Sequence, residues 1–263
     1  MNFNILGERI SKYRRKRSLF RYFLRSPWLV FAIPKNPLNL YFSKTLEKIF
    51  DSDVVSCLYN FLPERFLDSL KERGSTNTHK GQSLILYLIV KKYKPEMIVE
   101  TGVKYGGSSS FMLCAMHENS KGHLYSIDLP PYDASSEIAR DDAGMSIYTL
   151  EDGQRIRVNE EYKIGQLVPE YLKERWTLIL GDAKKELPTL LKKLDKISIF
   201  FHDSLHTYEH MMFEYETAWP YITKGGLLIS HDVLMNEAFL KFSKKRDLKP
   251  LFYYYSLAAI EKS

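Results

Sequence analysis

The clearest chemical pattern in the chain is a short stretch that combines an acid, two glycines and a serine. An apolar run ends at Glu100 and Thr101, and Gly102, Gly106 and Ser108 follow. Glycines at such a joint let the backbone approach a nucleotide-like ligand, and a helix that starts there offers free N–H groups. Because a carboxylate in the loop would repel a pyrophosphate, the spacing favours a cationic or hydroxyl-bearing ligand over a dinucleotide. A glycine-rich turn in another kind of α/β protein is the structural alternative.

Four more apolar runs end in an acid, which would place carboxylates along one edge of a parallel sheet. These acids are Asp128, Asp182, Asp203 and Asp232. Ligands of open α/β sheets bind outside the carboxyl ends of the strands. Asp128 could hold both ribose hydroxyls, and Asp182 with the N–H after it could recognise an adenine. A single acid of this kind is more often a solvated residue or a helix cap, but five acids at one edge favour a binding site.

The elements that must position these residues alternate between apolar runs and helical patterns. Such alternation predicts an α/β fold with an open, doubly wound sheet. The predicted strands span residues 96–100, 123–128, 176–181, 197–203 and 226–232. The predicted helices span residues 81–93, 108–117, 183–194 and 207–221. Pro188 predicts that the third of these helices starts later than residue 183, and residues 251–260 could close the sheet as an antiparallel hairpin.

The segments around these acids resemble the class I S-adenosylmethionine (SAM) methyltransferases of the methyltransferase-24 type. The similarity covers residues 81–232 and is carried by VETGVKYGGSSS, LYSIDLP, LILGDAKKELP, FFHDSLHTYEHMMFEYE and KGGLLISHD. It implies a Rossmann-like, seven-stranded sheet and a SAM cofactor. In the family, the loop after strand one holds the methionine portion, the acid after strand two holds the ribose, and the acid after strand three lies near the adenine. The cofactor-binding residues expected on this basis are Glu100, Thr101, Gly102, Gly106, Ser108, Asp128, Asp182 and Asp203.

The stretch 201–208 also resembles the strand-four motif of metal-dependent O-methyltransferases. In that motif an acid matching Asp203 binds a divalent cation, and a basic residue three positions on, here His206, takes the hydroxyl proton. A second metal ligand would match Asp232, although Val233 replaces the asparagine that usually follows. Oxygen ligands of this kind suit Mg²⁺ or Ca²⁺. The resemblance therefore implies Asp203 and His206 as catalytic residues, and Asp203 and Asp232 as metal ligands.

The histidines near this motif have other interpretations. An unperturbed imidazole has a pKa near neutrality, which suits a general base, but His206 could also be a surface residue near a helix start. His202, His206 and His210 could form a transition-metal site, which we disfavour because their spacing crosses a strand–helix junction. Upstream, Gly81-Gln82 matches the Gly-Gln pair that opens the helix before strand one in catechol and caffeoyl-CoA O-methyltransferases.

The net charge of +6 is concentrated near the N-terminus. Residues 1–50 hold eleven Lys or Arg and two acids, a sum of +9, so the remaining residues sum to 6 − 9 = −3. This basic, aromatic segment could pack on the domain or on a second subunit, or contact an anionic membrane surface, and nucleic acid is a weaker interpretation. We divide the chain into an N-terminal extension with accessory helices, 1–75, and a methyltransferase domain, 76–263. Residues 130–170 are an insertion that forms a lid, a substrate loop or a structural excursion.

Composition also bears on the compartment. The longest apolar run, residues 84–90, is far too short to span a membrane, and Cys57 and Cys114 form no metal or redox motif. We therefore expect a cytoplasmic protein without a signal peptide or a disulfide framework, either free or peripheral at the membrane.

The function predicted from these observations is SAM-dependent O-methylation of a small-molecule or glycan acceptor, such as a sugar hydroxyl. Mg²⁺ is the additional ion that the strand-four motif implies, and a homo-oligomer is compatible with the accessory helices. Two alternatives stay open: a cephalosporin-hydroxylase-like oxygenase on the same fold, and a non-enzymatic module that binds a surface through its N-terminus. The acceptor itself cannot be inferred from the sequence.

Overall fold

A computed structural model describes residues 62–73, 80–129, 139–140, 146–149, 155–158 and 163–263. The basic N-terminal segment and the first part of the predicted accessory helices lie outside the described residues. Their contacts with a membrane, a second subunit or nucleic acid, and the cytoplasmic location, stay predictions. Within the described residues, no helix is both long enough and apolar enough to cross a membrane.

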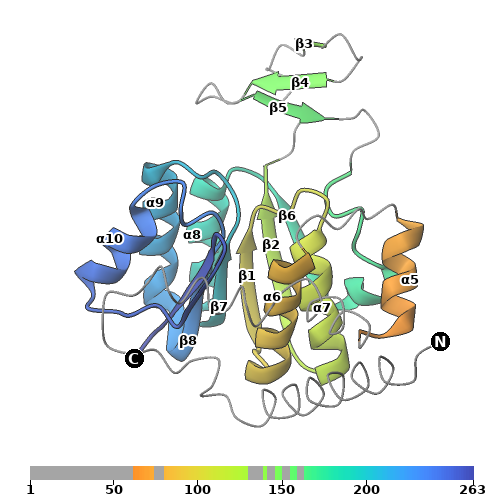
Figure 1. Ribbon diagram of the computed structural model, residues 1–263, viewed down its shortest axis with the longest axis horizontal. Helices are drawn as coiled ribbons and strands as arrows, with labels where there is room; N and C mark the ends of the chain where they lie inside the picture. Colours follow the sequence, from red (N-terminus) through yellow and green to blue (C-terminus); the bar gives the residue numbers. More distant parts are fainter. Residues whose placement is uncertain (1–61, 74–79, 130–138, 141–145, 150–154, 159–162) are drawn as a thin grey trace, which may run out of the picture.

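The centre of the molecule is a seven-stranded sheet with the strand order β6-β2-β1-β7-β8-β10-β9 (Figure 1). Every strand runs parallel to its neighbours except β10, which is antiparallel to both β8 and β9. This sheet confirms the α/β, Rossmann-like, doubly wound fold predicted from the sequence. It also confirms the closing antiparallel hairpin. The strands are β1 (Met97–Thr101), β2 (His123–Asp128), β6 (Trp176–Leu180), β7 (Ile197–His202), β8 (Ile222–Ser230), β9 (Phe252–Tyr254) and β10 (Leu257–Glu261).

Helices cover both faces of the sheet (Figure 1). One face packs against α5 (Glu64–Glu72), α6 (Lys80–Tyr93) and α7 (Gly107–Asn119), and the other against α8 (Ala183–Leu194), α9 (Tyr208–Ala218) and α10 (Ala238–Lys245). Neighbouring residues of β1 therefore enter different halves of the core: Ile98 packs with the first group and Val99 with the second. A parallel strand buried on both faces needs a continuous apolar run, which is why these runs identified the strands.

Two helices differ from the sequence-based prediction. Helix α8 begins at Ala183, and Pro188 lies within it. The prediction of a later start was wrong because Pro188, in the second turn, removes only one helical N–H donor, while Asp182 caps the helix by accepting from the Lys184 N–H at 2.8 Å. Helix α9 ends at Ala218 and continues as the 3-10 turn Trp219–Tyr221, since Pro220 has no N–H with which to continue the helix.

Strand β8 begins four residues before the predicted start at residue 226. Its pairing with β7 is irregular, because Ile197 faces Ile222 whereas Ile199 faces Leu227. Gly225, with φ +74°, lies inside this irregular stretch. The pair Gly225-Gly226 is typical of a turn, so the sequence did not indicate a strand here. A glycine inside a strand often marks such a bulge.

The insertion after β2 holds a second, small antiparallel sheet, which the sequence did not predict. Its strands are β3 (Ala139–Arg140), β4 (Ser146–Thr149) and β5 (Arg155–Val158). Figure 1 shows this sheet beyond the edge at which β2 ends. The 3-10 helix η1 (Glu170–Arg175) then leads into β6.

Candidate functional site

The loop after β1 lies directly against the end of β7. Gly102 has φ +83°, and a Cβ at this position would lie 2.0 Å from the carbonyl oxygen of Asp203. Gly106 has φ +85°, and a Cβ there would lie 2.9 Å from Gly165. Both positions therefore require glycine, for conformation and for space. The loop predicted to hold the cofactor and the strand end predicted to hold the acceptor are thus in contact.

Glu100 supports this loop from beneath. Its side chain is fully buried, and its carboxylate accepts hydrogen bonds from the hydroxyls of Ser108 at 2.6 Å, Ser109 at 2.6 Å and Ser126 at 2.7 Å. Burial raises the pKa of Glu100 to about 7, against the opposing effect of the three hydroxyls. Trp176 Nε1 in turn donates to the Ser126 hydroxyl at 2.9 Å. These contacts tie α7, β2 and β6 to the end of β1, and direct binding of SAM by Glu100 and Ser108 stays a prediction.

Asp128 lies at the end of β2, beside the same loop. Its Oδ2 accepts the N–H groups of Val103 at 3.1 Å and Lys104 at 2.7 Å. Burial raises the pKa of this carboxyl, while the backbone N–H groups act in the opposite direction. Asp128 is partly exposed, as a residue that binds the ribose must be. Asp182, the acid expected near the adenine, is also partly exposed, and one of its oxygens caps α8.

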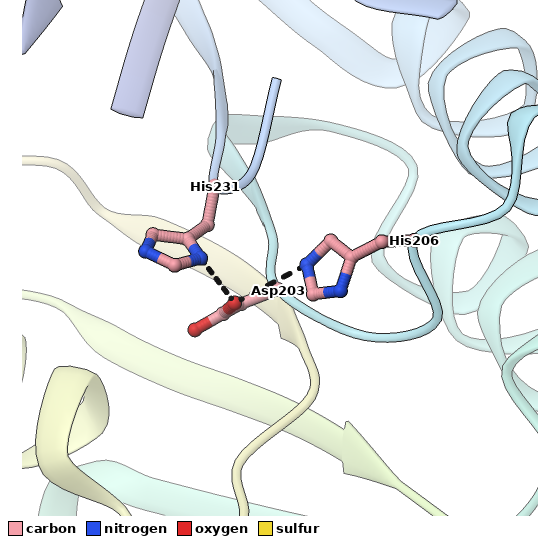
Figure 2. A group of neighbouring side chains, drawn as sticks. All are labelled: Asp203, His206 and His231. Atoms are coloured by element: carbon pink, nitrogen blue, oxygen red, sulfur yellow. Dashed lines mark ion pairs between the residues drawn. The ribbon is translucent and has the colours of Figure 1, made fainter. Parts of the chain in front are cut away.

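Four side chains meet where β7 and β8 end, and we call Asp203, His206, His231 and Asp232 the edge cluster. His231 Nδ1 lies 3.0 Å from Asp203 Oδ1 and 3.4 Å from Asp232 Oδ2. His206 Nε2 lies 3.6 Å and 3.7 Å from the same two oxygens. Figure 2 shows Asp203 between the two imidazoles. The four side chains are between 16% and 32% exposed, although the ring nitrogens of His206 and His231 that face the acids are closed off from solvent.

Strand register explains why these residues meet. His202 and Ser230 are partners in the parallel pair β7·β8, and the His231 N–H donates to the His202 carbonyl at 2.9 Å. Asp203 and His231, the next residues along each strand, therefore leave the sheet side by side. The prediction brought Asp203, His206 and Asp232 together correctly, but it assigned no role to His231.

The electrostatics of the edge cluster couple acids to imidazoles. Burial alone would raise the pKa of Asp203, but the imidazoles of His206 and His231 beside it lower it below its usual range. Burial alone would lower the pKa of His231, but Asp203 and Asp232 raise it above its ordinary value. Asp203 is accordingly anionic across the neutral range, and His231 is more basic than a free imidazole.

A second group of polar side chains lies deeper, and we call Glu214, His202, His210, Thr101 and Ser204 the buried cluster. Glu214 Oε2 lies 2.6 Å from His202 Nδ1 and accepts from the Thr101 hydroxyl at 2.6 Å. Its Oε1 accepts from the Ser204 hydroxyl at 2.8 Å and lies 2.9 Å from His210 Nε2.

Burial works to raise the pKa of Glu214, but the two imidazoles hold it far below its usual range. Thr101 is fully buried here, and its role at the cofactor stays a prediction. Nδ1 of His202 and Nε2 of His210 both face Glu214. The sequence signal for Glu214, an acid four residues after a histidine on α9, was overlooked.

A model of the methyltransferase domain family matches residues 99–233, slightly more than half of the chain. The chain belongs to this family of SAM-dependent class I methyltransferases. No curated protein matches the sequence. The prediction of this family and of SAM as its cofactor is confirmed.

Solved methyltransferase structures share the fold at low sequence identity. The SAH-bound methyltransferase PaMTH1 from Podospora anserina has a TM-score of 0.52 at 12% identity, covering 88% of this chain and 98% of its own. The O-methyltransferase NovP has a TM-score of 0.50 at 17% identity, covering 69% of this chain and 79% of its own. At these identities the likeness concerns the fold of the methyltransferase.

Proposed function

We propose that this methyltransferase moves the methyl group of SAM to an oxygen of a small-molecule or sugar acceptor. The observation that carries the proposal is the contact between Gly102 and the Asp203 backbone. It sets the glycine loop, on the cofactor side, directly against the edge cluster, on the acceptor side. NovP, which has the same fold, is an O-methyltransferase, and this supports oxygen as the acceptor atom.

The chemistry of the residues on the cofactor side of the site supports SAM binding. Gly102 and Gly106 let the loop pack closely against Asp203 and Gly165, which sets the backbone where the methionine portion is expected. Asp128, held by two loop N–H groups, offers its carboxylate to the ribose. Leu129 and Leu180 are about half exposed beside Asp128 and Asp182, and they supply apolar surface where the adenine is expected. Glu100, Thr101 and Ser108 then act from beneath, by fixing the loop.

On the acceptor side the protein must align the reactants and remove one proton, because the methyl group of SAM is already activated. A bond forms between the acceptor oxygen and the methyl carbon, the sulfur–carbon bond breaks, and the hydroxyl proton passes to Nε2 of His206. Asp203 and Asp232 lie 3.6 Å and 3.7 Å from that nitrogen. Their negative charge stabilises the imidazolium that forms.

Calorimetric titration of the full-length protein with SAM and with its demethylated product SAH tests the cofactor side. We expect Asp128→Ala to weaken binding roughly 10- to 100-fold, as for loss of a hydrogen bond to a charged group. Glu96→Ala is the matched control, since Glu96 precedes β1 at the opposite edge of the sheet and is mostly exposed. Wild-type protein that binds neither compound would refute the proposal.

A panel of small hydroxylated and sugar acceptors tests the acceptor side. Transfer of a labelled methyl group is expected to stop in His206→Ala while SAM binding stays intact. Methylation that appears on nitrogen or carbon, or that persists unchanged in His206→Ala, would contradict the oxygen-directed mechanism.

A further inference from the structure

We propose that Asp203, His206 and His231 form a binding site for a first-row transition-metal ion such as Zn²⁺, in place of the Mg²⁺ site that the family resemblance implied. One ligand atom from each residue lies within 4.8 Å of the other two, and this is the sole such group among the described residues. The inference goes beyond the proposed function, because metal binding is measured without any methyl transfer.

The distances are close to those of a real coordination sphere. Zinc binds imidazole nitrogen and carboxylate oxygen at about 2.1 Å, so two ligands of one ion lie about 3.0 Å apart in an octahedral site and about 3.4 Å apart in a tetrahedral one. Asp203 Oδ1 lies 3.0 Å from His231 Nδ1 and 3.6 Å from His206 Nε2. Small rotations of these side chains would therefore complete the site (Figure 2).

The donor set does not fit Mg²⁺. That ion requires octahedral oxygen coordination and is reluctant to lose water. Here two of the three mutually close ligands are nitrogens, Val233 stands where the motif usually has an asparagine, and Asp232 is not part of the group. Imidazole suits zinc, iron, nickel and copper, and two histidines with one carboxylate are the ligands of many non-haem iron sites.

The surroundings orient His231 as a ligand. Its Nε2 lies 3.1 Å from Gln82 Oε1, which can only accept, so Nε2 carries a proton and Nδ1 is the ring nitrogen that faces Asp203 and would bind an ion once deprotonated. Gln82 is itself held by its own amide N–H, which donates to the Ser256 hydroxyl at 3.2 Å. Metal-binding histidines typically have such a partner on the second ring nitrogen.

His206 is held by its backbone, and its reactive nitrogen is shielded. Asn236 Nδ2 donates to the His206 carbonyl at 3.0 Å. In the part of the chain that the structure describes, Nε2 of His206 is closed off from solvent and makes no hydrogen bond. A buried nitrogen of this kind calls for a partner, and an ion between it, His231 and Asp203 would provide one.

An ion here would supply Lewis-acid chemistry to an acceptor hydroxyl, because coordination lowers the pKa of a bound oxygen acid. Three protein ligands leave coordination positions open for that oxygen. In the metal-bound protein His206 is a ligand and no longer the proton acceptor, so the two roles of His206 are alternatives that metal binding decides.

The test is a titration of chelator-treated, full-length protein with Co²⁺, followed by visible absorption, and with Zn²⁺ and Mg²⁺, followed by calorimetry. We expect Co²⁺ to develop visible bands and Zn²⁺ to bind at least 100-fold more tightly than Mg²⁺. His231→Ala should abolish both signals. His117→Ala, which removes a half-exposed histidine at the last turn of α7, should leave them unchanged.

Gln82→Ala sharpens the test, since it removes no ligand and should weaken Zn²⁺ binding 10- to 100-fold. Far-ultraviolet circular dichroism and SAM titration of each variant establish that it is folded. Absence of Co²⁺ bands, Mg²⁺ binding as tight as that of Zn²⁺, or Co²⁺ bands that survive His231→Ala would overturn the proposal. If the protein binds SAM but no metal, the metal site is refuted and the proposed methyltransferase function is unaffected. If it binds metal but not SAM, only the proposed function is refuted. Oxygen consumption by the Fe²⁺-loaded protein would support the site and favour the oxygenase alternative for its chemistry.

Discussion

The edge cluster and the buried cluster are built from the same kinds of side chain and differ in how closely their carboxylates are paired. In the buried cluster, one fully buried carboxylate receives four partners at 2.6–2.9 Å. In the edge cluster, two partly exposed carboxylates lie 3.0–3.7 Å from two imidazoles, and the two distances to His206 are too long for hydrogen bonds. The Glu214 carboxylate therefore has a full set of partners, although His202 Nε2 and His210 Nδ1 make no hydrogen bond among the described residues. The carboxylates of the edge cluster, in contrast, have unused bonding capacity.

The comparison assigns a structural role to the buried cluster and a chemical role to the edge cluster, although both lie near the end of β7. Glu214 joins Thr101 at the end of β1, His202 at the end of β7 and its own helix α9. The rings of His202 and His206 then meet edge to face at 5.4 Å. The buried cluster thus fixes the strand ends beneath the edge cluster. Residue types alone do not distinguish the structural cluster from the one that could bind a ligand.

The largest effect is expected from breaking the buried cluster. Glu214→Ala leaves His202, His210 and two hydroxyls without their shared acceptor, and we expect a loss of about 3–5 kcal/mol in the free energy of unfolding. Urea unfolding measures this loss. Glu216→Ala is the matched control on the same helix: its ion pairs with Lys245 and Arg246 are at the surface, so its loss should stay below about 1 kcal/mol. Equal losses in the two variants would contradict the assignment.

A second prediction compares Glu214 with Glu100, its fully buried counterpart near the end of β1. Glu214 faces imidazoles and has a lowered pKa, whereas Glu100 faces neutral hydroxyls and has a pKa raised to about 7. The folded protein therefore keeps a proton on Glu100 that the unfolded chain releases above its ordinary value of 4.5. The stability that this proton contributes is fully present below pH 4.5 and is lost as the pH rises to about 7, by about 3 kcal/mol.

The measurement is the unfolding free energy of wild type and of Glu100→Gln at several pH values from 4.5 to 8. Glutamine has the same shape and does not titrate, so the wild type should lose stability relative to the variant as the pH rises. A difference that stays constant over this range would show that Glu100 is ionised throughout.

A third prediction concerns the response of the edge cluster to metal. Without metal, Asp203→Asn should change the unfolding free energy by less than about 1 kcal/mol, because the side chain is partly exposed. With Zn²⁺ at 100 times its dissociation constant, the wild type should gain about 2.7 kcal/mol. Asp203→Asn should lose this gain, and Glu216→Ala should keep it. A Zn²⁺ effect of equal size in Asp203→Asn would place the ion elsewhere.

Much of the fold could be predicted because burial on both faces of a parallel sheet demands apolar runs. Those runs gave the five parallel strands, and the acids that end them marked the correct edge. Helix α10 was not predicted, although its sequence has an asparagine before the helix and two phenylalanines three residues apart. In the structure, Asn236 accepts the Ala238 N–H at 2.8 Å, and Phe239 and Phe242 pack in the core. Short helices with few apolar positions are easily overlooked in this way.

The candidate site was harder to predict, because it depends on the pairing of distant strands. Asp203 and His231 are adjacent only through the register of β7 and β8, which no local pattern specifies. Gln82 reaches His231 from a helix that precedes β1. The spacing of His210 and Glu214 on one helix was visible, but burial turned this pair into a structural contact, and burial of a polar group is rarely evident from sequence.

The smallest predicted effect concerns Asp182, which caps α8 and is also predicted to lie near the adenine of SAM. As the N-cap of α8 it should contribute about 1 kcal/mol, so Asp182→Ala loses that amount while Asp182→Asn, which can still accept from the Lys184 N–H, loses only a few tenths. Because Asp182→Asn keeps the cap and removes the charge, any change in its SAM affinity isolates a role beside the adenine. Weaker binding in both variants would assign Asp182 to the cofactor site. Unchanged binding in Asp182→Asn, with lower stability in Asp182→Ala alone, would place it with Glu214 among the acids that hold the fold.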